Sequence, residues 1–168
     1  MTLAYVFWHR PRPDVSAEDY AKVLRRFHES LAAAAIPGFG RSWTVRVAEL
    51  PWLGAGPVYE DRYLIDDYTA LGVLNGAAVA VPGHDAAATR AASGTAGLYR
   101  LMTGEPDPAA TRAHWFDKPA GTAYQDLDPA AGGSLWQRQL TLGPGPEFQL
   151  LGGSPAPYPG PETTIEPL

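Results

Sequence analysis

The sequence contains no cysteine, and this absence removes several kinds of chemistry together. Disulfide bonds, thiolate metal sites and cysteine nucleophiles are all excluded. Long apolar runs are missing too, since none approaches the roughly 18 residues of a membrane-spanning helix. The opening MTLAYVFWHRP lacks a basic stretch followed by a long apolar one, so no secretory signal is expected. We therefore expect a cytoplasmic protein without a membrane partner.

Positive charge is in deficit as well. The chain of 168 residues has 13 Lys and Arg against 18 Asp and Glu, a net charge of −5. A general nucleic-acid binder needs a basic surface, so no nucleic-acid partner is expected. With 45% hydrophobic residues and this length, one globular domain is the default. The excess of Ala, Gly, Pro and Arg over Ile, Asn and Lys suggests a GC-rich bacterial genome.

Recognised catalytic and ligand-binding motifs are also absent. The glycine-rich pieces do not match a P-loop or a dinucleotide-binding pattern, and no GxSxG is present. The four histidines show none of the HxH, HxxxH or HExxH spacings of metal sites. We therefore expect no metal and no cofactor. Arginines in different strands (Arg46, Arg62, Arg138) suggest either an anion clamp or, as the more common arrangement, cross-strand charge pairs.

What the chain does have is a dense set of reactive side chains between Val58 and Ala80. The pattern VYEDRYLI predicts a strand, and the following DDYTALGVLNGAA predicts a helix that Asp66 or Asp67 caps. Neither face of the strand is purely apolar or purely polar. This mixture indicates a pocket wall or a subunit interface on at least one face, while an edge strand with solvated charges is the alternative.

The remaining elements follow from periodicity and from the positions of Pro and Gly. Leu3–Arg10 predicts a central strand, and Ser16–Ala35 predicts an amphipathic helix with a capping box. Further strands are expected at 41–50, 134–142 and 147–151, with Trp52 folding back from the loop after the first of these. The segment from His84 to Met102 predicts a broken helix, and Gly104–Gly133 an irregular insert. One domain over residues 1–151 is followed by a Pro-rich extended tail at 152–168.

This order of elements is that of a ferredoxin-like α+β fold, β-α-β-β-α-β, with an antiparallel sheet and helices on one face. With its aromatic first strand AYVFWHRP, the chain resembles the dimeric α+β barrel superfamily, which includes antibiotic-biosynthesis monooxygenases and EthD-like and NIPSNAP-like domains. The resemblance implies a homodimer with a pocket in each subunit between sheet and helices. It carries no catalytic residue over, because no family motif is matched.

In such a sheet the strands that begin at Leu3 and Val58 are neighbours. His9 and Asp61 can then form an acid–base pair together with Tyr63, in which the carboxylate orients the imidazole. The alternatives are a histidine bonded to backbone and a carboxylate paired with Arg46 or Arg138. A shift of one residue in register would exchange Asp61 and Glu60. The expected substrate-binding residues are Tyr5, Phe7, Trp43, Tyr59, Trp136 and Arg138.

The sequence thus predicts a protein that binds a small hydrophobic molecule, with three hypotheses about its use. The first is a cofactor-independent oxygenase, cyclase or isomerase acting on a hydrophobic or aromatic metabolite. The second is a dimeric binding or scaffolding module without chemistry. The third is a haem protein with a ligand among His9, His28, His84 and His114. The loop around Asp117 and Lys118 is expected to hold an ion pair or to act as a lid.

Overall fold

In the part of the chain that the structure describes, eight strands close into one antiparallel barrel. The computed structural model describes residues 1–127, 132–139, 145–155 and 157–168. Around the barrel the described strands follow the order β1-β3-β2-β8-β5-β7-β6-β4. Their bounds are β1 Leu3–Pro11, β2 Phe39–Val47, β3 Val58–Ile65, β4 Ala91–Thr103, β5 Arg112–Phe116, β6 Ser134–Arg138, β7 Phe148–Leu151 and β8 Glu162–Pro167.

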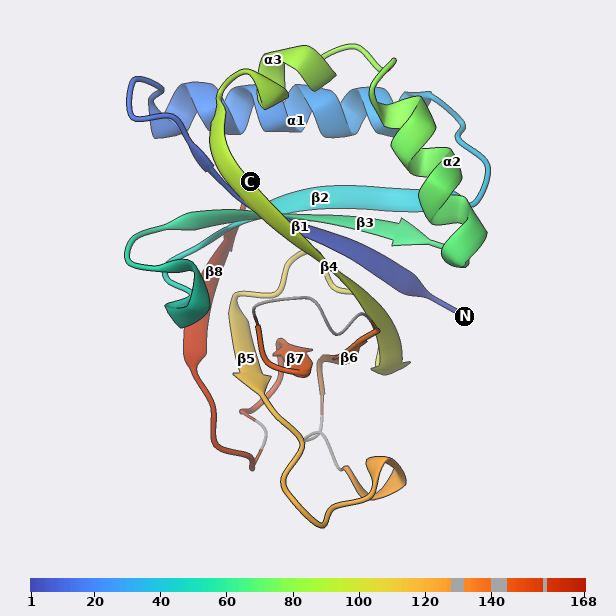
Figure 1. Ribbon diagram of the computed structural model, residues 1–168, viewed down its shortest axis with the longest axis vertical. Coiled ribbons are helices and arrows are strands. Elements are labelled where there is room, and N and C mark those ends of the chain that lie inside the picture. Colours follow the sequence, from blue (N-terminus) through green and yellow to red (C-terminus); the bar gives the residue numbers. More distant parts are fainter. Residues whose placement is uncertain (128–131, 140–144, 156) are drawn as a thin grey trace.

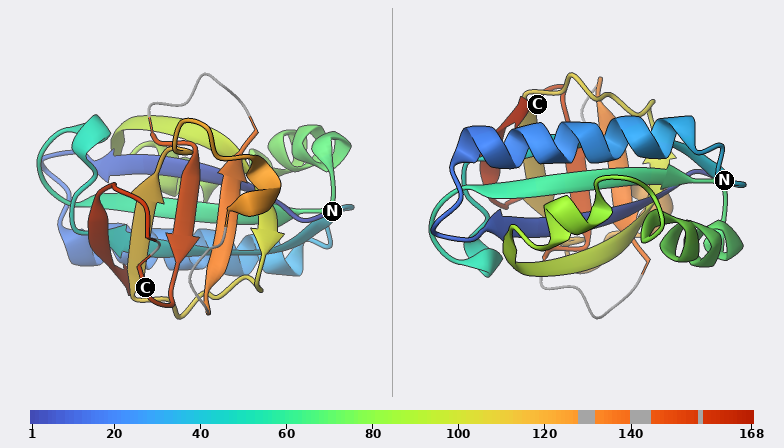
Figure 2. Two further views of the ribbon diagram at one scale, coloured as in Figure 1. Left: turned by 90° about the horizontal axis from the view of Figure 1, so that it is seen from below. Right: turned by 90° about the horizontal axis from the view of Figure 1, so that it is seen from above.

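Three helices lie at one end of the molecule, over the strands of its N-terminal half (Figure 1). They are α1 Ala17–Ala33, α2 Tyr68–Ala78 and the short α3 His84–Ala88. Two single 3₁₀ turns, η1 Pro51–Leu53 and η2 Tyr124–Asp126, interrupt loops. Seen from above in Figure 2, α1 runs along β3 while α2 and α3 lie on its other side. The helices therefore cover the outer face of β1 and β3.

The predicted ferredoxin-like α+β fold is wrong. The first half does place β4, β1, β3 and β2 side by side, with helices on one face. Four further strands then close this sheet, because β8 joins β2 to β5 and β6 joins β4 to β7. The closed barrel therefore replaces both the open sheet and the α+β architecture that the superfamily resemblance implied. Periodicity reports the faces of single strands, but the sequence carries no signal for ring closure between strands so far apart.

Strand β3 is paired with a neighbour on both sides, so the edge-strand alternative is also wrong. It pairs with β1 through Phe7 opposite Asp61 and with β2 through Thr44 opposite Asp61. All eight of its residues are buried. Its mixed side chains follow from this position, because one face meets the helices and the other meets the barrel interior.

The barrel interior is filled mainly by large aromatic and aliphatic side chains. Trp8, Trp115 and Trp136 are each at most 1% exposed and lie among valines and leucines from neighbouring strands. Trp8 and Trp115 pack edge to face, with ring centroids 5.7 Å apart. Trp52 folds back from η1 onto Trp115 with centroids 5.0 Å apart, as expected. The described part of the barrel interior is therefore a packed core.

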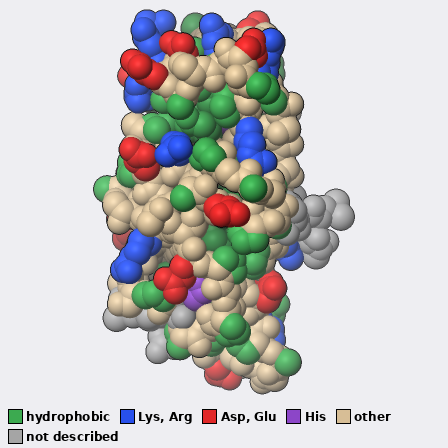
Figure 3. All heavy atoms as spheres, turned by 90° about the vertical axis from the view of Figure 1, so that its left-hand side faces the viewer, with side chains coloured by type: hydrophobic (Ala, Val, Ile, Leu, Met, Phe, Trp, Pro, Cys, Tyr) green, Lys and Arg blue, Asp and Glu red, His purple; other side chains and the backbone are tan. Residues whose placement is uncertain are grey.

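Helix α1 forms where its sequence predicts it. Ser16 accepts a hydrogen bond from the Asp19 amide at 3.0 Å and caps the N-terminus. Its buried stripe comprises Tyr20, Leu24, Phe27, His28 and Leu31, among others. The opposite side carries charges, and Figure 3 shows side chains of both signs gathered over this end of the molecule. Asp67 caps α2 in the same way through the Ala70 amide at 2.9 Å.

The segment predicted as a broken helix from His84 to Met102 is a short helix followed by the longest strand, β4. Two glycines explain the difference, because aromatic rings lie directly over them. A Cβ on Gly94 would stand 2.2 Å from Phe7, and one on Gly97 would stand 2.8 Å from Tyr99. These glycines permit ring packing across the strand, so tertiary contacts override the helical pattern of the alanines.

The insert and the tail both contribute strands. Within 104–133, β5 pairs with β7 and β8, while residues 128–131 lie outside the described part. Within 152–168, β8 pairs with β2 and β5, and residue 156 is not described. The strand predicted at 134–142 is seen as β6, and positions 140–144 lie outside the described residues. Among the described residues, no helix is long and apolar enough to span a membrane.

Candidate functional site

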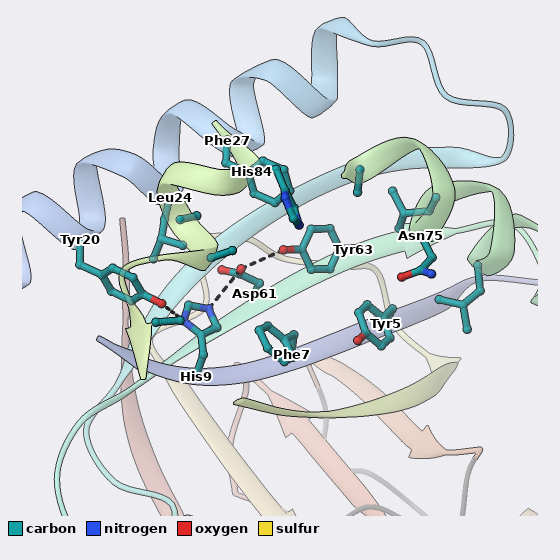
Figure 4. Close-up of a pocket in the computed structure, with 16 residues that line it drawn as sticks. Tyr5, Phe7, His9, Tyr20, Leu24, Phe27, Asp61, Tyr63, Asn75 and His84 are labelled. Carbon is teal, nitrogen blue, oxygen red and sulfur yellow. Dashed lines mark hydrogen bonds and ion pairs between the residues drawn. The ribbon is translucent and has the colours of Figure 1, made fainter. Parts of the chain in front are cut away.

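A cavity of about 180 Å³ lies between the helices and the outer face of β1 and β3. Its walls are mostly apolar and come from Phe7 on β1, from Leu24 and Phe27 on α1, and from Leu71 and Leu74 on α2. Figure 4 shows His9, Asp61 and Tyr63 together on the sheet side, with Tyr20 reaching them from α1. The cavity therefore combines an apolar wall with one polar cluster.

Asp61 is the centre of that cluster. It is 3% exposed and accepts hydrogen bonds from the Thr44 hydroxyl at 2.5 Å and the Tyr63 hydroxyl at 2.8 Å. The Nε2 atom of His9 lies 3.1 Å from Oδ2, and that of His28 lies 3.3 Å from Oδ1. Burial alone would raise the pKa of this carboxyl, but the two imidazoles and their contacts outweigh burial and hold the pKa well below its usual range. Asp61 is therefore an anion.

The contacts of the two imidazoles with Asp61 are close approaches of 3.1 and 3.3 Å, and each is an ion pair only when its ring is protonated. In the described part of the chain, neither Nε2 atom makes a hydrogen bond of regular geometry, although both are buried. The carboxylate is the nearest charged group to each of them. Because Asp61 is an anion, each Nε2 is expected to carry a proton, which fixes the tautomer of both rings.

With Nε2 facing Asp61, the Nδ1 atom of each ring meets a hydroxyl. Nδ1 of His9 lies 2.6 Å from the Tyr20 hydroxyl, and Nδ1 of His28 lies 2.6 Å from the Ser42 hydroxyl. A neutral ring accepts a hydrogen bond at Nδ1, whereas a charged ring donates one there. Tyr20 lines the cavity, while Ser42 is partly exposed on β2. The cluster thus has one hydroxyl at the cavity and another near the surface.

The tyrosines of the cluster are kept neutral. Burial raises the pKa of Tyr20, and the negative charge of Asp61 raises it further. Burial likewise raises the pKa of Tyr63 well above its usual value, followed by the charge of Asp61 and the hydrogen bond to it. Both phenols therefore act as hydrogen-bond donors and acceptors, not as anions.

The far end of the cavity has a second, looser set of polar groups. Tyr5 on β1, Asn75 on α2 and His84 on α3 line it. Burial raises the pKa of Tyr5. Asn75 and Ala88 are exposed lining residues and mark a mouth between α2 and α3. A ligand that enters there meets these groups first and the Asp61 cluster last.

The structure brings together five of the nine residues that the sequence singles out. Tyr5, Phe7, His9, Asp61 and Tyr63 line the cavity. Tyr59 lies behind His9, with ring centroids 6.1 Å apart, and donates to the Ala17 carbonyl at 3.3 Å. The register question is settled in favour of Asp61, because Glu60 points into the barrel.

Trp43, Trp136 and Arg138 do not line this cavity. Trp136 is fully buried inside the barrel, and Trp43 packs against the same core. Arg138, the last residue of β6, donates to the Gly145 carbonyl. The alternation of a strand separates its two faces, but it does not say which face meets the helices. These residues therefore lie away from the face that the cavity occupies.

Three residues of the cluster were missed as site residues: Tyr20, His28 and Thr44. Tyr20 and His28 interrupt the otherwise apolar stripe of α1, which is a signal that polar groups are needed on a buried face. Thr44 lies on the predicted strand 41–50 and carries no signal of its own. Only the pairing of β2 with β3 places it opposite Asp61.

A second buried ionic cluster lies on the opposite face of β3. Arg62 donates to Glu60 at 2.8 Å and to Gln149, and Trp8 donates to Glu60 at 2.8 Å. The guanidinium of Arg62 also lies over the Trp136 ring, 4.9 Å from its centroid. Arg62 is therefore not part of an anion clamp with Arg46, which instead lies 3.7 Å from Glu166.

The other polar groups named from the sequence lie apart from the cavity cluster. Asp117 accepts from the Glu147 amide at 2.8 Å, and Lys118 donates to the Thr122 carbonyl at 2.7 Å, so the loop is tied to its own surroundings. It lies at the end of the barrel opposite the helices (Figure 1), which excludes a lid over this cavity. Among the described residues, no group of three His, Asp or Glu side chains is placed to hold a metal ion.

Comparison with known proteins adds no relative to this picture. No protein-family model matches the chain, and no curated protein matches it. The resemblance to the dimeric α+β barrel superfamily therefore has no support from a family match. Function has to be argued from the cavity itself.

Proposed function

We propose that this protein is a small enzyme that transfers a proton on an uncharged hydrophobic or aromatic metabolite without a bound cofactor. The observation that carries this proposal is the apolar cavity closed at one end by Tyr20, His9 and Asp61. Pockets with a few convergent polar groups and perturbed ionisable residues are the usual sites of such chemistry.

The size and charge of the cavity support this choice of ligand. A cavity of about 180 Å³ is close to an engineered cavity of about 150 Å³ that takes benzene, so it suits a molecule of about one ring. Its lining contains no Lys or Arg, and its one carboxylate is already fully engaged. An anionic ligand would lose its hydration without gaining a cation, which disfavours carboxylates and phosphates.

The proton would move through Tyr20. Its hydroxyl can take a proton from the carbon next to a carbonyl of the ligand while it passes its own to Nδ1 of His9, so that no phenolate forms. The electron pair of the broken C–H bond stays on the ligand as an enolate until a proton returns. This fits the raised pKa of Tyr20. Asp61 holds the other side of the ring and stabilises the imidazolium that results. The reverse sequence returns the proton to another atom of the ligand, which is an isomerase-type or cyclase-type reaction.

The first test measures binding with acetophenone as a neutral probe and benzoate as a charged one. Acetophenone should raise the melting temperature of the protein, and benzoate should not. Ala78→Leu, which places a larger side chain in the cavity wall, should abolish the shift. Val79→Leu, at an exposed position next to it, is the matched control and should keep the shift. Equal shifts in both variants would show that the probe binds elsewhere.

The second test measures proton transfer on a panel of small cyclic and aryl ketones in D₂O by NMR. For at least one ketone the protein should speed exchange of the protons next to the carbonyl by about 100-fold, the lower range of general acid–base catalysis. His9→Gln should lose this effect and still bind. Binding without any exchange across the panel would reject the enzymatic proposal.

A non-catalytic binding protein is the second candidate, and one observation favours it. Both nitrogens of His9 and both oxygens of Asp61 already have partners inside the protein. Such saturation also suits a structural cluster. Haem binding is not favoured, because a macrocycle of four pyrrole rings exceeds a cavity suited to one ring.

The homodimer remains a prediction. It was expected because an aromatic sheet face needs cover. Here the helices cover Tyr5 and Phe7, while strands β5 to β8 of the same chain enclose the other face. Light scattering with size-exclusion chromatography tests whether two copies associate.

A further inference from the structure

Asp61 contacts two imidazoles, although the proposed chemistry uses only His9. His28 reaches Oδ1 of the carboxylate from α1 as His9 reaches Oδ2 from β1. The side chains of the two histidines are 2% and 9% exposed. A second buried histidine on one carboxylate needs an explanation of its own.

The charge balance of Asp61 and the two imidazoles gives that explanation. One carboxylate compensates one excess positive charge, so one imidazolium beside Asp61 makes the cluster neutral. Two imidazolium rings would leave a net positive charge among buried side chains, which costs several kcal/mol per ion in general terms. Groups that interact this strongly do not bind protons independently.

We propose that His9 and His28 share a single excess proton across Asp61, and that His28 is a positioning residue that holds this proton while His9 is neutral. Because both Nε2 atoms face the carboxylate, the proton that comes and goes resides on Nδ1 of either ring. On His9 this atom meets Tyr20 at the cavity, and on His28 it meets Ser42 near the surface. A proton gained by His9 is matched by one released from His28.

The surroundings of the two rings supply no other charge. His9 is packed by Tyr20 from α1 and by Tyr59 and Asp61 from β3. His28 is packed by Tyr63 and Asp61 from β3, by Ser42 from β2 and by its neighbour Phe27. Burial is the main cause that raises the pKa of all three tyrosines. Among these groups Asp61 alone is charged when both rings are neutral.

This sharing deepens the proposed function and rests on it for its biological use. When the ligand passes a proton to His9 through Tyr20, the cluster would briefly hold two excess protons beside one carboxylate. Release from His28 towards Ser42 keeps the buried cluster neutral while His9 accepts a proton from the ligand through Tyr20. The sharing itself exists without any ligand, so it can be measured independently of the enzymatic proposal.

The experiment is an NMR titration of ¹⁵N-histidine-labelled, ligand-free protein from about pH 4.5 to 9. Ring nitrogen shifts report which nitrogen of each histidine carries a proton. In the wild type, His9 and His28 should each respond in two steps at least about one pH unit apart, as expected of a strongly coupled pair. In His28→Gln the two steps of His9 should merge into one, and in His9→Gln those of His28 should merge.

A matched control is His84→Gln. His84 lines the same cavity, but it pairs with Asp85 at 3.1 Å and does not contact Asp61. It should leave the two-step curves of His9 and His28 unchanged. Amide spectra check that each variant is folded.

Independent single-step curves in the wild type would overturn the proposal, and this outcome can be read even if a variant fails to fold. Unchanged curves for His9 in a folded His28→Gln would overturn it as well. Two-step curves combined with no exchange on any ketone would leave the shared proton in place and reject only the enzymatic function.

Discussion

Two buried carboxylates lie next to each other on β3 and differ in every partner. Glu60 points into the barrel and is matched by Arg62, Trp8 and Gln149. Asp61 points to the helices and is matched by two histidines and two hydroxyls beside a cavity. A guanidinium keeps its charge throughout the accessible pH range, whereas an imidazole changes its charge near neutrality. The inner cluster is therefore suited to holding the barrel, and the outer one to moving protons.

The largest effect is expected from Arg62→Met, which leaves Glu60 buried without its cation. Breaking a buried ion pair from one side should lower the free energy of unfolding by about 4 kcal/mol. Urea unfolding at pH 7 measures this. The double variant Glu60→Gln, Arg62→Met should recover much of the loss because the stranded charge is gone. A double variant no more stable than the single one would contradict the ionic role of this cluster.

Asp61→Asn should cost somewhat less, about 3 kcal/mol at pH 7, because the one excess proton that the two imidazoles share can leave in response. Its effect also depends on pH. The folded-state pKa of Asp61 lies below that of an unfolded aspartate, near 3.9, so the carboxylate stabilises the fold above that value. This contribution is lost as the pH falls through the folded-state pKa. The stability difference between wild type and variant should begin to narrow only below about pH 3.9, so urea unfolding at pH 7, 5 and 3 should give the smallest difference at pH 3.

Alanine variants of two glycines on β4 compare the free space on the two faces of that strand. Gly97→Ala should cost about 2 kcal/mol, because Tyr99 and Trp8 are packed in the barrel and cannot move away. Gly94→Ala should cost less than about 1 kcal/mol, although its Cβ would meet Phe7 more closely, because Phe7 can turn into the cavity. Thermal unfolding ranks the two variants. A greater loss of stability in Gly94→Ala than in Gly97→Ala would mean that the Phe7 ring cannot move into the cavity. Weaker acetophenone binding in Gly94→Ala would show that the ring does occupy the cavity.

A small change in stability, similar to that of Gly94→Ala, is expected from Tyr20→Phe. It removes one hydrogen bond to His9, worth about 1 kcal/mol, and leaves the ring contacts in place. Under the proposed function, proton exchange on the ketone should nevertheless fall to the level of His9→Gln. Exchange that survives in Tyr20→Phe would mean that His9 contacts the ligand without a relay. Urea unfolding and the D₂O assay measure the two effects separately.

The sequence predicted individual elements better than it predicted how they join. The stripe and cap of α1 and the strand at Val58 follow from local periodicity, and the pairing of β1 with β3 brought His9 and Asp61 together. The segment of β4 was wrongly predicted as a helix because Gly94 and Gly97 make room for the rings of Phe7 and Trp8 from β1 and of Tyr99 on β4 itself. Closure of the barrel depends on contacts between distant segments, for which one sequence gives no pattern.

The site was predicted in part for the same reason. His9 and Asp61 were found because both lie on strands with readable alternation. His28 was named only as a haem ligand, although its place on the apolar stripe of α1 marks it as a partner of the sheet. Trp136 and Trp43 were assigned to the cavity because alternation separates the two faces of a strand. It does not show which face meets the helices and which meets the barrel interior.

The position of β8 has a consequence for how the chain folds during synthesis. Residues Glu162–Pro167 fit between β2 and β5, and every other strand leaves the ribosome before them. Until they emerge, two strand edges stay unpaired, and such edges attract other chains. Closure also joins segments far apart in the sequence, which slows folding. A chain truncated just before residue 162 should therefore aggregate or recruit chaperones more than a chain that contains residues 162–167.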